Sequence, residues 1–224
     1  MGFLCLVYGG LQMEAQASSM TIALDTAFGN YEPEQDGYKG TYGTVVFEEI
    51  SDINGDSVKI TINSGADLGS TPDLHKFYFN TTSDLRLLSD IGQEGNNGLR
   101  IATTTPTADL YYSFATEDKA FRADGDGYFD GVIDFGSGGD KLSKATFTIR
   151  SENSDGSFND LYISNFMDGS FGGPKGSFTV ATHWQNTDTP AGSEWVGGNP
   201  NPVPIPAPFW VLGIGLLGIR RFMK

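Results

Sequence analysis

Three aspartates near the middle of the chain have the spacing of oxygen ligands for a calcium ion. Asp124, Asp126 and Asp130 form the pattern D-x-D-x-x-x-D in a glycine-rich stretch. An EF-hand loop also needs Asp or Asn at its fifth position and Glu at its twelfth, where Tyr128 and Phe135 stand here. Asp-Gly-Asp-Gly is also a common hairpin turn, and we favour the turn over a Ca²⁺ site.

The sequence holds two histidines, His75 and His183, in no recognisable metal-binding or catalytic pattern. A zinc site built on them would need carboxylate ligands, because the single cysteine, Cys5, lies in a stretch expected to be removed. His75 has apolar neighbours such as Phe77, which favours a histidine packed within a strand.

Residue patterns typical of hydrolases do not lead to an active site. No Gly-x-Ser-x-Gly nucleophile motif occurs. Glu48 and Glu49 are neighbours on a predicted strand, so they face opposite sides of the sheet and cannot act together as a glycosidase pair. We therefore predict no catalytic residues and no enzyme activity.

Two tryptophans are candidates for stacking on sugar rings. Trp184 lies on a predicted strand, and Trp195 lies in a glycine-rich stretch after it. Packing in the core or against a loop is the default role of a tryptophan, and sugar stacking is the alternative.

The elements that must position these residues are short strands. Apolar and polar residues alternate with period two, as in Val58–Asn63, which is typical of half-buried strands. Turn signals such as Asn54-Gly55 separate the strands. Strands are predicted at Thr21–Leu24, Thr41–Ile50, Val58–Asn63, Leu74–Asn80, Leu85–Ser89, Leu99–Thr103, Leu110–Ala115, Tyr128–Phe135, Ala145–Arg150, Leu161–Phe166 and Phe178–Trp184.

About ten strands without a disulfide framework predict an all-β fold, an antiparallel two-layer sandwich of jelly-roll type over residues 18–198. No window supports a long amphipathic helix, and a short one is expected at Ser157–Tyr162. The 30 glycines and 16 phenylalanines suit short strands joined by tight turns.

The charge balance of the 224-residue chain excludes one class of partner. It has 28 acidic and 14 basic residues, for a net charge of −14, and three of the cations lie in the last five residues. A phosphate backbone would be repelled by the body, so we expect no nucleic-acid partner.

The N-terminal residues 1–17 have features of a secretory signal peptide. Phe3–Leu11 is apolar, and Ala15-Gln16-Ala17 has the small-x-small pattern of a cleavage site. No basic residue precedes the apolar stretch, which is consistent with a truncated start.

The C-terminal region has three parts in a fixed order. Residues 199–208 carry prolines at every second position and predict a stiff, polyproline-II-like arm. Phe209–Ile219 is uncharged but only marginally long for a membrane helix. Arg220 and Arg221 follow at once, which favours a cytoplasmic end.

This tail resembles a PEP-CTERM sorting signal, a family found in Gram-negative bacteria. Val203, Pro204 and Pro206 match the proline motif, and Arg220 and Arg221 match the terminal arginine cluster, whereas an isoleucine stands where the name-giving motif has Glu. The resemblance implies recognition, and processing, by an exosortase-like membrane enzyme. It implies an inner-membrane intermediate and then delivery to the cell surface or the extracellular matrix.

The leading hypothesis is an exported surface or matrix protein with a non-enzymatic structural or interaction role. The first alternative is a carbohydrate-binding module for extracellular polysaccharide, with Ca²⁺ as a possible cofactor. The second is a hydrolase whose site no motif shows. An exposed row of aromatic side chains would favour the first alternative, and a cleft with converging carboxylates the second.

Overall fold

The computed structural model describes residues 18–28, 39–53, 55–82, 98–105, 111–114, 121–123, 127–136, 142–152, 156–172, 177–189 and 192–201. These stretches form strands and short 3-10 turns. The elements are β1 (Ser19–Phe28), β2 (Lys39–Asp52), β3 (Gly55–Ser64), η1 (Ala66–Leu68), β4 (Asp73–Phe79), β5 (Gly98–Thr105), β6 (Tyr111–Phe114), β7 (Phe121–Ala123), β8 (Gly127–Phe129), β9 (Gly131–Asp134), β10 (Lys144–Glu152), β11 (Phe158–Asn159), η2 (Ile163–Phe166), β12 (Phe171–Gly172), β13 (Val180–Gln185) and β14 (Ser193–Gly198).

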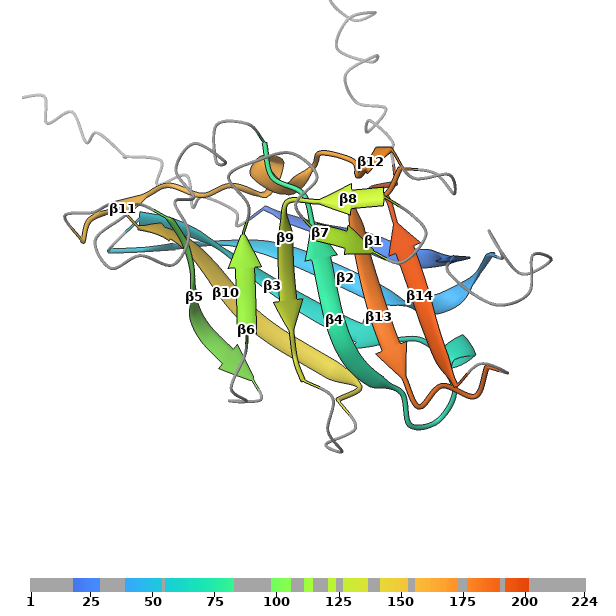
Figure 1. The fold of residues 1–224 in the computed structure, drawn as a ribbon. Coiled ribbons are helices and arrows are strands. Elements are labelled where there is room, and N and C mark those ends of the chain that lie inside the picture. The colour runs from blue at the N-terminus through green and yellow to red at the C-terminus, as the bar shows by residue number, and fades with distance from the viewer. Residues whose placement is uncertain are drawn as a thin grey trace, which may run out of the picture.

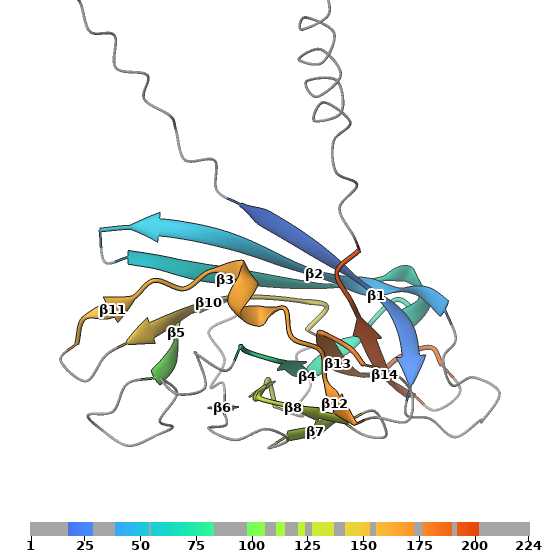
Figure 2. The same cartoon turned by 90° about the horizontal axis from the view of Figure 1, so that it is seen from above.

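Most of the strands belong to one curled antiparallel sheet, which confirms the all-β prediction. Its order is β11-β10-β3-β2-β1-β14-β13-β4-β9-β6, and β5 also pairs with β10. One half of the sheet, with β2 and β3, lies over the other half, with β4 and β13 (Figures 1 and 2).

Strand β1 belongs to both halves of the sheet. Its first part, from Ser19 to Leu24, pairs with β2, and its last part, from Thr26 to Phe28, pairs with β14. The register with β2 shifts between Leu24 and Thr26, and such an irregularity bends and twists a strand. β1 therefore forms a corner between the halves.

The main core lies between the two halves. Side chains from β3 and β10 show why these strands form: on each strand alternate residues are apolar and fully buried, as the sequence predicts. The fully buried large side chains of this core include Phe47, Phe77, Phe147 and Trp184.

A second cluster covers part of the outer face of the β4–β13–β14 half. The small sheet β12-β8-β7 lies across this face at one end of the strands (Figure 1). Phe129 from β8 packs there with Tyr78 from β4, and Phe28 stacks on Phe178 with ring centroids 5.2 Å apart. The other end of these strands carries the polar residues considered below.

Several expected elements differ in the structure. Tyr128–Phe135 is not one strand: β8 ends at Phe129 and β9 starts at Gly131, because the chain passes at Asp130 from the small sheet to the large one. Leu161–Phe166 contains the 3-10 turn η2 instead of a strand, and Ser157–Tyr162 contains β11 instead of a helix. The strand predicted at Leu85–Ser89 lies outside the described residues.

Candidate functional site

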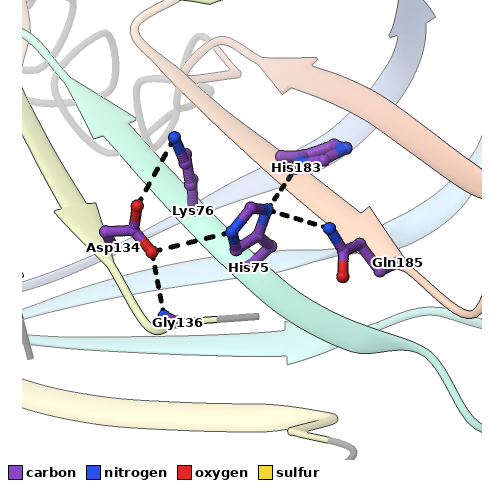
Figure 3. A network of polar contacts seen from close by, with 6 residues as sticks. All are labelled: His75, Lys76, Asp134, Gly136, His183 and Gln185. Carbon is purple, nitrogen blue, oxygen red and sulfur yellow. Dashed lines mark hydrogen bonds and ion pairs between the residues drawn. The ribbon is translucent and has the colours of Figure 1, made fainter. Parts of the chain in front are cut away.

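The fold brings the two histidines of the chain into contact. His75 lies on β4 and His183 on β13, 108 residues apart in sequence but on paired strands. Their Nδ1 atoms are 3.0 Å apart, and their ring centroids are 5.2 Å apart. Figure 3 shows the two rings at the centre of a polar network.

A β-bulge in β4 brings His75 to this position. His183 pairs with Lys76, and Trp184 pairs with Leu74, so His75 is an extra residue that no residue of β13 opposes. Such a bulge re-aims a side chain. The side chain of His75 is 18% exposed and points to the outer face, whereas Leu74 enters the main core. His75 is thus packed within a strand, as expected, but against His183 on the outer face and not in the main core.

Asp134 on β9 lies at the other edge of the His75 ring. Its Oδ1 is 3.7 Å from His75 Nε2 and accepts a hydrogen bond of 2.9 Å from the Gly136 amide. Its Oδ2 lies 3.4 Å from the ammonium of Lys76, its cross-strand neighbour (Figure 3). Asp134 thus favours a proton on Nε2 of His75, which leaves the lone pair on Nδ1.

That lone pair has two neighbours. Gln185 Nε2 lies 3.1 Å from His75 Nδ1, and His183 Nδ1 lies 3.0 Å from it. One lone pair cannot fully satisfy two hydrogen-bond donors. Trp195, opposite His183 on β14, stacks on the His183 ring with centroids 4.4 Å apart and planes 16° apart, which fixes the ring's orientation.

The surroundings keep both imidazoles neutral at neutral pH. Burial lowers the pKa of His75, and the opposing effect of the Asp134 carboxylate is smaller. Burial, followed by the positive charges that His75 and Lys76 can carry, lowers the pKa of His183 to about 4. Neutral imidazoles expose lone pairs, so the pair can bind a proton donor or a metal ion.

Acidification is expected to destabilise the body through these two side chains. The unfolded-state pKa of histidine is about 6.5 and the folded-state pKa of His183 is lower, so the unfolded chain binds more protons as pH falls from about 6.5 towards 4. The contribution of the neutral histidines to the free energy of unfolding is therefore fully present above about pH 6.5 and decreases as the pH falls below it. Allowing for solvent screening of a partly exposed ring, we expect a loss of roughly 1 kcal/mol between pH 7 and pH 5. Urea unfolding in EDTA at both pH values measures it.

A matched variant separates this effect from the titration of other groups. His183→Gln keeps a polar side chain that does not titrate, so its stability should change less between pH 7 and pH 5. An equal loss in the variant and the wild type would show that carboxylates, and not the histidine pair, set the acid sensitivity.

The predicted Ca²⁺ ligands are only partly within the described residues. Asp124 and Asp126 lie outside them. Asp130 is buried between β8 and β9, where its Oδ2 accepts a 3.0 Å hydrogen bond from the Thr81 amide. In the described part of the chain, no three His, Cys, Asp or Glu side chains are grouped to hold a metal ion. Ca²⁺ binding stays a prediction, and the observed contact of Asp130 fits a structural role.

Removing that contact gives a test. Asp130→Ala leaves the buried Thr81 amide without this acceptor, and we expect a loss of about 2–3 kcal/mol in the free energy of unfolding, measured with urea. Asp130→Asn keeps an acceptor oxygen and should lose less. If Asp130 is instead a Ca²⁺ ligand together with Asp124 and Asp126, added Ca²⁺ should raise the melting temperature of the wild type but not of Asp126→Ala.

The structure separates the two tryptophans proposed to stack on sugars. Trp184 is fully buried in the main core, with its Nε1 donating a 2.8 Å hydrogen bond to Thr182 Oγ1. A buried ring cannot stack on a sugar, so that hypothesis is wrong for Trp184. Trp195 is half-buried, and His183 covers one face of its ring.

The tail residues proposed for sorting, Val203, Pro204, Pro206, Arg220 and Arg221, lie outside the described residues. The apolar run Phe209–Ile219 lies outside them too. In the part of the chain that the structure describes, no helix has the length and apolar character needed to cross a membrane.

Sequence reasoning missed Lys76, Asp134 and Gln185 as partners of the histidines. One signal was available for Gln185, because the alternation of β13 places it on the same face as His183. Asp134 and Lys76 could not be placed without the strand order and the bulge.

Comparison with known proteins adds no identification. No protein-family model matches the chain, no curated protein matches its sequence, and no solved structure matches its fold.

Proposed function

We propose that this protein is exported and displayed at the cell surface or in the extracellular matrix, with a structural or interaction role and no enzyme activity. The observation that carries the proposal is the order of the tail: proline arm, short apolar run, arginine cluster. A short apolar run next to basic residues suits temporary retention in a membrane, with the body outside. An exosortase-like enzyme is the partner that would process the tail at Val203, Pro204 and Pro206.

The positions of the two ends of the body support this function. Ile22 on β1 forms an isolated bridge with Pro200, the first proline of the arm. Asn201, the last described residue, therefore follows directly after a contact with β1, four residues from the first described residue, Ser18. The end of the body that leads into the tail is thus tied to the first strand of the body, so the tail follows a folded element and is not part of the main core.

Two finer features belong to the same proposal. Early strands pair with late ones, as β1 with β14, β4 with β13 and β3 with β10, which is what the winding of a jelly roll produces. We infer a jelly-roll sandwich from these pairs, and a short membrane helix from Phe209–Ile219.

The observations lend less support to the alternatives. A sugar-binding face built on Trp184 and Trp195 loses its first member to the core. A hydrolase would need a nucleophile or a converging acid pair, and the contacts observed around His75 are to another histidine, an amide and a paired carboxylate.

Deleting residues 202–224 should release the body from the membrane without unfolding it. The arm lacks half of its amide donors and cannot extend a sheet, and the main core described here extends from Ile22 to Val196. The measurement is membrane fractionation of the full chain and the deletion variant in a Gram-negative host with an exosortase-like enzyme, with circular dichroism of the released body.

The matched control keeps the length of the tail and changes only its charge. Arg220→Ser with Arg221→Ser should lower the yield of processed protein, because the stop signal is weakened. Mass spectrometry of the protein recovered after expression of the full-length chain then shows whether the tail has been cleaved. Recovery with Lys224 still attached would contradict sorting by cleavage and leave a simple tail anchor.

A further inference from the structure

The end of the β4–β13–β14 half that no described strand covers carries a site that the proposed export function does not use. The small sheet covers the other end of this face, where Tyr78 and Ala181 lie in the second cluster. His75, His183 and Gln185 lie on the same face, nearer the other end of β4 and β13 (Figure 3). The Nδ1 atoms of the two histidines and the amide nitrogen of Gln185 meet here, and the His75 side chain is 18% exposed.

We propose that His75 and His183 chelate a divalent copper ion through their Nδ1 atoms, with the side-chain oxygen of Gln185 as the third protein ligand. The spacing of the nitrogens is the first argument. With metal–nitrogen bonds of about 2.0–2.1 Å, nitrogens 3.0 Å apart subtend an angle of about 91–97° at the metal.

That angle is compatible with tetragonal coordination of a metal ion. A tetrahedral site would separate the same two nitrogens by about 3.3–3.4 Å. An angle near 90° is that of square-planar or tetragonal coordination, which Cu²⁺ and Ni²⁺ prefer with nitrogen and oxygen ligands. Cu²⁺ binds such ligands most strongly among the divalent first-row ions, so it is the expected occupant.

The third ligand follows from the crowding around His75 Nδ1. The Gln185 amide lies 3.1 Å from that atom. Its nitrogen and oxygen differ only by a 180° turn of the amide, so Oε1 can take the same place and face the ion. The amide then replaces the third histidine or carboxylate that a more familiar site would have, and water completes the coordination.

The surrounding residues have the roles expected around metal ligands. A metal-bound imidazole commonly gives its other N–H to a carboxylate, and Asp134 lies 3.7 Å from His75 Nε2, fixed by Gly136. Trp195 holds the His183 ring by stacking. Lys76 brings positive charge near the site, but Asp134 pairs with it.

Titration of the full chain with CuCl₂ tests the site. The protein is purified in mild detergent through a tag without histidine, treated with EDTA and dialysed. Calorimetry should show one Cu²⁺ bound per chain, and the electron paramagnetic resonance spectrum should be axial with splitting from two nitrogens. His75→Gln and His183→Gln should each remove one nitrogen and lower the affinity by more than about 100-fold, because loss of a ligand exceeds the 10–100-fold cost of losing an outer partner.

Lys76→Gln is the matched control, because it changes the same bulge without removing a ligand. It should keep the two-nitrogen spectrum and should not lower the affinity, since it removes a positive charge near the site. Should a histidine variant fail to fold by circular dichroism, Asp134→Asn keeps both imidazoles and should still weaken Cu²⁺ binding by about 10–100-fold.

Unchanged copper affinity and spectrum in the double variant His75→Gln with His183→Gln would overturn the proposal. Absence of binding in the wild type would also overturn it, and leave a hydrogen-bonded histidine pair. Export is measured separately by fractionation, so either conclusion can fail without the other.

Discussion

Replacement of Trp184 by alanine is expected to lower the free energy of unfolding by about 3–5 kcal/mol, the range for removing a fully buried aromatic side chain. Trp184 is 0% exposed and lies on β13, an interior strand of the sheet. The substitution leaves a large cavity in the main core and removes the hydrogen bond to the buried hydroxyl of Thr182. Urea unfolding at neutral pH, followed by circular dichroism, measures the loss.

Trp195→Ala is the matched control for this experiment. Trp195 is half-buried and packs against Phe28, Tyr78 and His183 on the outer face, so we expect a loss of roughly 1–2 kcal/mol. Equal losses for the two variants would contradict the assignment of Trp184 to the core and Trp195 to the outer face.

The second large effect concerns the junction of β1 and β14. Gly198→Ala should cost about 3 kcal/mol or more, because a Cβ at this position would lie 2.1 Å from the Ala23 carbonyl oxygen and 2.8 Å from Ile22 Cγ2. The obstructing oxygen belongs to the backbone and cannot turn away, so the two strands must separate. The melting temperature and the urea midpoint of the full-length variant measure the cost.

Gly156→Ala controls for the conformational cost of replacing a glycine. Gly156 has a φ of 80°, and a Cβ there would meet no atom within 4 Å. Its replacement should cost about 1 kcal/mol, from the left-handed backbone alone. If Gly198→Ala costs no more than this, β1 and β14 do not approach as closely as described.

Sequence patterns predicted the strands whose two faces differ strongly in polarity. In β3 and β10 every second side chain enters the main core, so the period of two is visible without knowing the neighbours. The pattern failed where the chain changes sheets. Tyr128–Phe135 was expected to be one strand, but Asp130 lies at the crossing between two sheets, and the sequence pattern alone does not show which sheet buries each face.

The candidate site was less predictable than the fold, for a local and a global reason. Locally, the bulge at His75 turns a side chain whose alternation with Phe77 indicates the core. Globally, His75, Asp134 and His183 come from three strands that are neighbours only in the sheet order. The residues of the site were visible in the sequence, but their proximity depends on strand pairing, which one sequence does not determine.

The position of β14 has a consequence for the order of folding. Among the described strands it is the only link in the ladder between β1 and β13. The pair Thr26↔Gly197 joins residues 171 positions apart (197 − 26), and contacts this distant in sequence form slowly. Until Ser193–Gly198 has been synthesised, β1 and β13 keep unpaired edges and the ladder stays in two pieces. A chain synthesised from its N-terminus therefore cannot complete this sheet until almost its last described residue has been added. The proposed export would pass the chain through a membrane in this incompletely folded state.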